Sequence, residues 1–215
     1  MADLTLTMAT GPYDRIAALE RGLVRPEGIS LDYTTRLPVH DIFLAMAERS
    51  EFDVAEMSLA LYLIRRCQRD FPFVALPVFP SRLFRHGNIF VNRHGGVESP
   101  KDLEGKRVGI QEYRQTALVW VRGFLRDDYG VKTDAILWHE GGVNVPRTAS
   151  PETDVRPARE LSITPLPDGA TLSEALAAFE LDAVIAARRP ECLKTCADVT
   201  RMFPDFRAVE RAYFE

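Results

Sequence analysis

The sequence predicts an α/β protein of two lobes, each a doubly wound sheet covered by helices. The first observation behind this prediction is the β-α-β-α-β-α-β order of residues 4–79, which favours parallel strands joined by crossover helices. The second is a further alternation of strand and helix patterns over residues 107–187. The third is a pair of similar junctions, at 47–54 and 177–184, where an acidic residue, a hydrophobe and an aspartate lead into an apolar strand. Two lobes built alike would produce this pair, and so would chance.

The first lobe is expected to span residues 1–92. Its helices follow turn and capping signals at Gly11-Pro12, Pro38 and Ser58, because proline pre-sets the first helical turn and serine can cap it. Its strands are expected where apolar and β-branched residues alternate or run together. These segments are Leu4–Thr10, Ile29–Thr35, Phe52–Met57, Phe73–Phe79 and Asn88–Asn92.

The second lobe is expected to span residues 93–200, and residues 201–215 to begin a crossover back to the first lobe. One helix is expected to start at Gln115 or Thr116, and another follows the capping box of Thr171 and Glu174. Residues 141–160 lack periodicity and are expected to form a long loop. The strands are expected at Arg107–Gln111, Ala135–His139 and Ala183–Ala187.

Composition narrows the function classes. The chain of 215 residues has a net charge of −4 and no block of like charges, which argues against a nucleic-acid partner, since such binders carry a basic face. It has no run of about 18 apolar residues, so no membrane partner is expected. The N-terminus lacks the pattern of a signal peptide, which favours a cytoplasmic protein. The cysteine and histidine spacings fit no metal site, and no metal or other cofactor is expected.

Two segments carry a resemblance at the level of fold. Ser99–Ile110, with its Leu-x-Gly-Lys turn before a strand, resembles the entry to the second lobe of type II solute-binding proteins. Glu180–Val184 resembles a later helix-to-strand junction of the same proteins. The resemblance implies the two-lobed type II periplasmic-binding-protein fold, with a ligand bound between the lobes.

A narrower resemblance covers nearly the whole chain. Its motifs are Gly11–Arg15, Phe52–Ser58, Phe79–His86, Gly109–Tyr113 and Trp138–Gly142. They are similar to those of the 4,5-dihydroxyphthalate decarboxylase family, which implies removal of a carboxyl group from a small aromatic dicarboxylate. The family chain continues past Phe214-Glu215 and completes the first lobe. The resemblance therefore implies that the C-terminal part of that lobe is missing here, either because the chain is a fragment or because a partner supplies it.

Candidate site residues follow from the rule that ligands bind at the carboxyl ends of the strands of a doubly wound sheet. Helices that start there favour anions through their free N–H groups and dipoles. The first lobe contributes Tyr13, Arg15, Glu56 and Ser58. The second lobe contributes Gln111, Glu112, Tyr113, Gln115, Thr116, Glu140 and Arg188.

Decarboxylation assigns roles to some of these residues. Arg82, Arg85 and Arg188 are candidate carboxylate anchors, because a guanidinium matches carboxylate geometry. His86 is the candidate proton shuttle. Glu112 or Glu56 could donate a proton to carbon if burial favours its neutral form, and Tyr13 and Tyr113 could bond the phenolic hydroxyls. The alternatives left open are an exposed turn for His86, solvated charges for the arginines and an ion pair for Glu56.

Three functions remain at this point. The first is a cofactor-independent decarboxylase of a hydroxylated aromatic dicarboxylate. The second is a solute-binding protein for a small anion, with no chemistry. The third is an inactive, truncated remnant. The sequence leaves a homo-oligomer open in each case.

Overall fold

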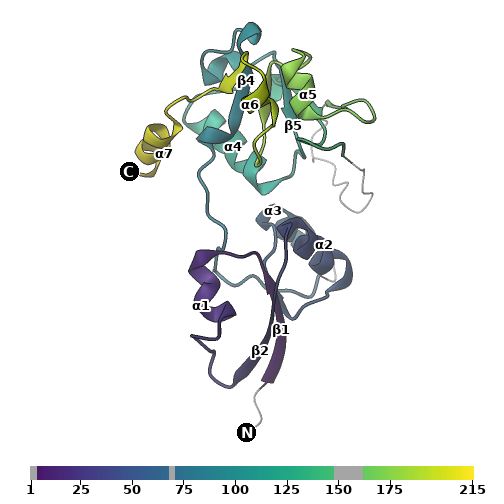
Figure 1. The fold of residues 1–215 in the computed structure, drawn as a ribbon, viewed down its shortest axis with the longest axis vertical. Coiled ribbons are helices and arrows are strands. Elements are labelled where there is room, and N and C mark those ends of the chain that lie inside the picture. The colour runs from purple at the N-terminus through teal and green to yellow at the C-terminus, as the bar shows by residue number, and fades with distance from the viewer. Residues whose placement is uncertain (1–3, 68–70, 148–161) are drawn as a thin grey trace. The chain divides into compact units, whose positions relative to one another are not determined.

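The structure is a computed structural model that describes residues 4–67, 71–147 and 162–215. The chain divides into two compact units, residues 1–83 and residues 84–215, each with its own sheet (Figure 1). Within the described ranges, no helix combines the length and the apolar character that a membrane span requires.

The first unit holds a three-stranded parallel sheet in the order β2-β1-β3. The strands are β1 (Leu4–Thr10), β2 (Ile29–Thr35) and β3 (Val54–Ala55). The helices are η1 (Asp14–Ile16), α1 (Ala17–Glu20), α2 (Val39–Arg49) and α3 (Leu59–Cys67). Helix α2 lays Ile42, Ala45 and Met46 on Ala9 of β1 and on Phe52, and these side chains form the core. The expected first helix is shortened to a 3-10 turn and one helical turn.

The second unit holds a six-stranded mixed sheet in the order β7-β6-β5-β8-β4-β9. Strand β4 runs antiparallel to its two neighbours, and the other pairs are parallel. The strands are β4 (Ile89–Asn92), β5 (Arg107–Ile110), β6 (Leu137–Glu140), β7 (Ile163–Pro165), β8 (Ala183–Ile185) and β9 (Val199–Arg201). The α-helices are α4 (Thr116–Asp127), α5 (Leu172–Ala177), α6 (Cys192–Thr195) and α7 (Phe206–Phe214), and the 3-10 helices are η2 (His86–Asn88), η3 (Arg93–Gly95), η4 (Pro100–Leu103) and η5 (Thr133–Ala135).

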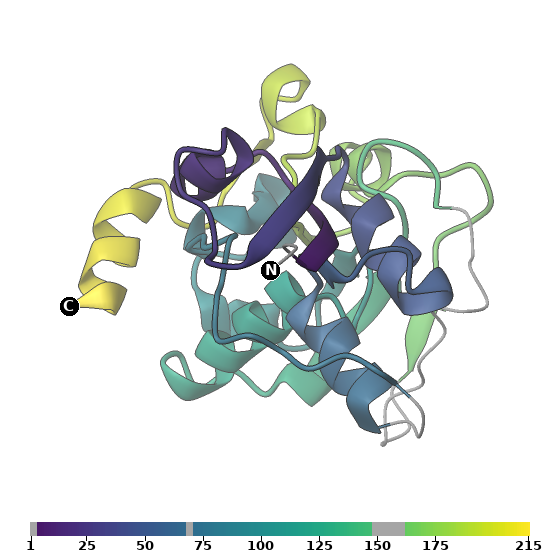
Figure 2. The same cartoon turned by 90° about the horizontal axis from the view of Figure 1, so that it is seen from below.

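Two apolar clusters form the core of the second unit. One joins α4 to the sheet through Leu118, Val121 and Trp138. The other joins α5 to the sheet through Leu172 and Leu176. Helix α7 lies at the edge of this unit in both views (Figure 1 and Figure 2).

The two similar sequence junctions form the same structural joint in both units. Ser50 and Phe179 are the described non-glycine residues with positive φ, at 48° and 58°. Three residues later, Asp53 and Asp182 each accept a hydrogen bond of 2.8 Å from a backbone N–H, that of Thr7 in β1 and that of Arg107 in β5. The strand that follows each aspartate, β3 or β8, pairs in parallel with that same strand, β1 or β5. The predicted α/β architecture of two units, each with its own sheet, is confirmed.

The prediction of a strand at Phe73–Phe79 is wrong. The segment pairs with no strand among the described residues. Prolines at 72, 77 and 80 remove backbone donors that a sheet ladder needs. Val74 and Leu76 are 80% and 65% exposed, so apolar composition suggested a burial that the segment does not have.

The strand expected at Asn88–Asn92 forms as β4, but its partners are β8 and β9 of the second unit. The division between the compact units accordingly falls between residues 83 and 84, while the sequence led us to expect it between 92 and 93. The expected loop at 141–160 is described only as far as 147. Strand β7 follows it, which the sequence analysis did not anticipate.

Candidate functional site

In the first unit, predicted site residues meet where β1 and β3 end. Glu56 follows β3 and is 8% exposed. Its Oε2 accepts a hydrogen bond of 3.1 Å from the N–H of Gly11, and its Oε1 accepts one of 2.7 Å from the hydroxyl of Tyr13. Because β1 and β3 are neighbouring parallel strands, their carboxyl ends bring Tyr13 and Glu56 together, although 43 residues separate them in the sequence.

The Tyr13–Glu56 pair has a defined direction of proton donation. Burial, and next the hydrogen bond and charge of Glu56, raise the pKa of Tyr13 to about 12. Tyr13 therefore donates as a neutral phenol near pH 7, and Glu56 accepts with both oxygens. The alternative of an ion pair between Glu56 and an arginine is not what the structure shows, since its hydrogen-bond partners among the described residues are Gly11 and Tyr13.

Replacing Glu56 with glutamine is expected to lower the pKa of Tyr13 below its wild-type value of about 12. The pKa should stay above that of free tyrosine, because burial, the larger cause, remains. ¹³Cζ-tyrosine NMR during a pH titration measures this, with Tyr13→Phe to assign the signal. Asp53→Asn, which changes an exposed carboxylate of the same unit, should leave the titration unchanged. A wild-type Tyr13 that titrates like free tyrosine would contradict the pairing.

The other predicted residues of the first unit are less enclosed. Arg15 is exposed and donates a hydrogen bond to the carbonyl of Pro80. The Ser58 hydroxyl lies 3.4 Å from the N–H of Leu61, the capping position expected at the start of α3. Arg82 is exposed, with its guanidinium 5.9 Å from the centre of the Phe79 ring. The structure does not bring Arg82 to the Tyr13–Glu56 pair.

In the second unit, two acidic residues and two arginines gather where β5 and β6 end. Glu112 accepts a hydrogen bond of 2.7 Å from Nη2 of Arg114. Arg147 pairs with Oε2 of Glu140 at 2.5 Å and lies 3.6 Å from Glu112. The other oxygen of Glu140 accepts the N–H of Tyr113 at 2.9 Å. We name Glu112, Tyr113, Arg114, Glu140 and Arg147 the strand-end cluster.

Sequence reasoning found three members of the strand-end cluster and missed both arginines. Arg114 lies between two predicted residues and could have been included from its position alone. Arg147 comes from a loop without periodicity, and no local pattern distinguishes it. Both arginines are mostly enclosed, with side chains 12% and 29% exposed.

The loop that carries Arg147 is held by glycines and an asparagine. A Cβ at Gly142 would overlap the carbonyl of Val145, so the tight turn requires glycine. Asn144 donates to the carbonyl of Arg189 at 3.0 Å and accepts the N–H of Glu191 at 2.9 Å. These contacts tie the loop to the segment after β8. The predicted residue Arg188 lies in that segment and is exposed.

The start of α4 faces the same end of the sheet. Gln115 occupies the N-cap position, Thr116 is the first helical residue, and Gln111 follows β5 directly. Oε1 of Gln115 and Nε of Arg114 are buried and have no hydrogen-bond partner among the described residues. Arg122, which lies within α4, donates a hydrogen bond to the carbonyl of Tyr113 at 2.6 Å. The sequence analysis did not select Arg122.

His86 lies in an aromatic cage, away from the strand-end cluster. It is 1% exposed, and its ring stacks on that of Phe124 with centres 4.0 Å apart. Tyr129, Phe203 and Tyr213 complete the cage. Neither ring nitrogen has a hydrogen-bond partner among the described residues, and burial lowers the pKa of His86. The alternative of an exposed turn is therefore wrong, and the proton-shuttle role stays a prediction.

Replacing His86 with phenylalanine is expected to raise the free energy of unfolding of the second unit by about 1 kcal/mol at pH 7.5, because two buried unpaired nitrogens are removed. The gain should widen as pH falls below about 6.5. The folded pKa is lowered, so the unfolded wild type binds more protons and its stability is lost with acid. Urea unfolding followed by tryptophan fluorescence measures the gain in the free energy of unfolding. A gain that stays constant from pH 7.5 to 5.5 would contradict the prediction.

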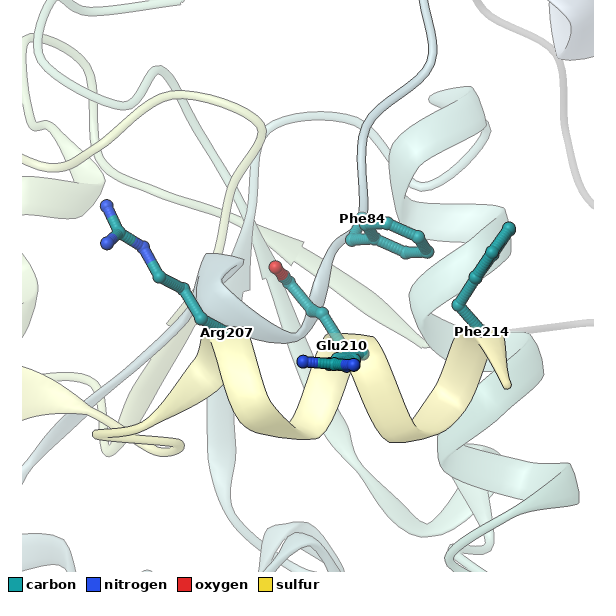
Figure 3. Close-up of a pocket in the computed structure, with 5 residues that line it drawn as sticks. Phe84, Arg207, Glu210 and Phe214 are labelled. Atoms are coloured by element: carbon teal, nitrogen blue, oxygen red, sulfur yellow. The ribbon is translucent and has the colours of Figure 1, made fainter.

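Arg85, next to His86, is half-buried, and burial lowers its pKa. The adjoining cavity, about 350 Å³, is lined by Phe84, Arg207, Glu210, Arg211 and Phe214 (Figure 3). The rings of Phe84 and Phe214 meet edge to face at 5.9 Å, and Glu210 accepts the N–H of Gly87 at 3.0 Å. This open hollow contains none of the predicted site residues. Among the described residues, no group of three or more His, Cys, Asp or Glu could hold a metal ion.

No model of a known protein family matches the chain. The chain is 37% identical over 216 residues to a 4,5-dihydroxyphthalate decarboxylase of Comamonas testosteroni, and 38% identical over 192 residues to one of Pseudomonas putida. These matches cover 100% and 89% of this chain. The chain belongs to the 4,5-dihydroxyphthalate decarboxylase family. It spans 65% of the length of the Comamonas relative and 74% of that of the Pseudomonas relative.

Two solved structures are distantly similar. One is the alkanesulfonate-binding protein SsuA from Xanthomonas axonopodis, at 14% identity and a TM-score of 0.47, covering 94% of this chain and 61% of that one. The other is an ancestral arginine-binding protein, at 17% identity and a TM-score of 0.31, covering 97% and 72%. The family resemblance predicted from the sequence is confirmed by the two curated relatives.

Proposed function

We propose that this chain acts in the decarboxylation of a hydroxylated aromatic dicarboxylate of the 4,5-dihydroxyphthalate kind. Both curated relatives carry the name of that reaction. The observation that carries the proposal is the Tyr13–Glu56 pair, a neutral phenol held by a buried carboxylate at the end of two parallel strands. Such a pair can accept a proton from a phenolic hydroxyl and pass it on.

The reaction needs one proton moved off oxygen and one delivered to carbon. A ring hydroxyl para to the leaving carboxylate gives up its proton, and the electrons pushed into the ring let the carbon bearing that carboxylate take up a proton. The bond from that carbon to the carboxylate then breaks, its electron pair returns to the ring, and CO2 leaves. Tyr13 receives the hydroxyl proton while handing its own to Glu56. Glu56, which then holds that proton, is the proposed source of the proton for carbon, because Glu112 is paired with Arg114 as a carboxylate.

The arginines of the strand-end cluster suit the anchoring of carboxylates. Arg114 pairs with Glu112, and Arg147 pairs with Glu140. A substrate carboxylate can replace either side-chain carboxylate, because a guanidinium matches carboxylate geometry. The internal ion pairs therefore mark positions that suit an anion. Arg82, Arg85 and Arg188, the anchors predicted from the sequence, stay proposals.

A CO2-release assay tests the proposal. The purified protein is offered 4,5-dihydroxyphthalate, phthalate and 3,4-dihydroxybenzoate, each with and without chelator. We expect CO2 from 4,5-dihydroxyphthalate alone, because it has both the electron-donating hydroxyls and the second carboxylate. Binding of 4,5-dihydroxyphthalate in calorimetry without CO2 release would overturn the decarboxylase and favour the solute-binding alternative.

A further inference from the structure

Tyr113 is fixed from several directions at once. Its N–H donates to Glu140 at 2.9 Å, and its carbonyl accepts from Nη1 of Arg122 at 2.6 Å. The same guanidinium lies over its ring, 3.7 Å from the ring centre. Trp138 meets the ring edge to face at 5.8 Å. One side chain of α4, Arg122, therefore contacts both the backbone and the ring of Tyr113.

Enclosing the Arg122 side chain is unfavourable for the free energy of folding. It is half-buried, and burial lowers its pKa. It makes no ion pair with a carboxylate in the part of the chain that the structure describes, unlike Arg114 and Arg147. Enclosing a cation without an acidic partner is unfavourable. An apolar side chain would pack α4 at lower cost, so core packing alone does not account for an arginine here.

The hydroxyl of Tyr113 differs from the backbone and the ring face in its contacts. No described residue makes a hydrogen bond with it, although the backbone and the ring face are both occupied. A fixed ring whose hydroxyl has no partner among the described residues can offer that hydroxyl to a polar group on a ligand. The hydroxyl of a core tyrosine usually finds an internal partner. The arrangement of Tyr113 is therefore more typical of a residue that contacts a ligand.

We propose that Arg122 is a positioning residue that fixes Tyr113, so that the Tyr113 hydroxyl recognises a ring hydroxyl of the aromatic diacid. This inference rests on the proposed function. Arginine suits the role because its planar guanidinium stacks on the ring and donates to the carbonyl at the same time. Lysine can keep the charge but cannot do both.

Calorimetry with two ligands tests the proposal on the whole chain. The probes are 4,5-dihydroxyphthalate and phthalate, which differ only in the ring hydroxyls. Tyr113→Phe is expected to reduce the preference for the dihydroxylated ligand about tenfold, the contribution of one hydrogen bond. Arg122→Met should reduce it by a similar factor while leaving phthalate affinity unchanged. The double variant should lose no more than either single variant, and Arg122→Lys should recover only part of the preference.

The matched control is Arg126→Met, one turn further along α4. Arg126 is 70% exposed and pairs with Asp127, so its loss should change neither affinity. A wild-type preference in Arg122→Met, or effects of Arg122→Met and Tyr113→Phe that add, would overturn the inference.

A ligand-free measurement separates this inference from the proposed function. NMR of ring-labelled tyrosine should show the Tyr113 ring ordered in the wild type and mobile in Arg122→Met. If the wild type binds neither diacid, the proposed function fails, and a ring that stays ordered in Arg122→Met would overturn the positioning role by itself. Should Arg122→Met not fold, as judged by tryptophan fluorescence, Arg122→Lys is used in both measurements.

Discussion

Replacing Glu56 with glutamine is expected to lower kcat for CO2 release from 4,5-dihydroxyphthalate by a factor of about 10² to 10⁴, the usual contribution of a general acid or base. The amide can still accept the N–H of Gly11 and fill the same space. It cannot take up the proton that Tyr13 hands on. KM should change little, because Glu56 is proposed to move a proton and not to bind a carboxylate.

Steady-state CO2 release at saturating substrate measures this effect. Asp53→Asn is the matched control, since Asp53 lies three residues earlier, is exposed, and contacts Thr7 of β1 instead of Tyr13. Its kcat should stay at the wild-type value. A kcat within about threefold of wild type in Glu56→Gln would remove Glu56 from the proton path.

Tyr13 and Glu56 could each be selected from the sequence as strand-end residues from strand order alone, whereas the hydrogen bond between them is seen only in the structure. The β-α-β pattern implies parallel neighbours, and parallel neighbours end at one edge of the sheet. Glu112 and Glu140 follow from the same rule applied to β5 and β6. The joint at Asp53 and Asp182 was visible as a repeated pattern, but only the structure shows that both aspartates accept a backbone N–H of a neighbouring parallel strand.

The misses have a common physical cause. The cage around His86 is built by Phe124, Phe203 and Tyr213, which lie far along the chain, so no local pattern could show its burial. Arg122 contacts Tyr113 from within α4, and Arg147 contacts Glu140 from an irregular loop. For Phe73–Phe79 the local pattern itself misled, because the apolar residues predicted a strand although prolines interrupt the segment.

Replacing Asp182 with alanine is expected to lower the free energy of unfolding of the second unit by about 3 kcal/mol. Asp182 is 6% exposed and accepts the backbone N–H of Arg107 at 2.8 Å. It also accepts Nε and Nη2 of the same residue at 3.1 and 2.9 Å. Alanine leaves that N–H without its acceptor at the start of the central strand β5, and the guanidinium keeps only the carbonyl of Phe179.

Tryptophan fluorescence during urea unfolding measures this loss in one unit. Both tryptophans, Trp120 and Trp138, belong to the second unit, and Trp138 is 1% exposed. Asp182→Asn keeps an acceptor for the N–H and should lose less. Asp53→Ala breaks the equivalent joint in the first unit and should leave the fluorescence transition unchanged. A transition in Asp182→Ala that matches the wild type would show that the joint adds nothing to stability.

Acid should erase the difference between Asp182→Ala and the wild type. Burial alone would raise the pKa of Asp182, but the hydrogen bonds and charge of Arg107 outweigh it and hold the pKa below its usual value. A carboxyl group whose folded pKa is lowered stabilises the fold above its unfolded pKa of about 3.9 and loses that contribution as pH falls through the folded value. The gap in unfolding free energy should therefore be full at pH 7 and close below about pH 4. A gap that persists in acid would mean that packing around Asp182, and not its charge, maintains the joint between the helix and β5.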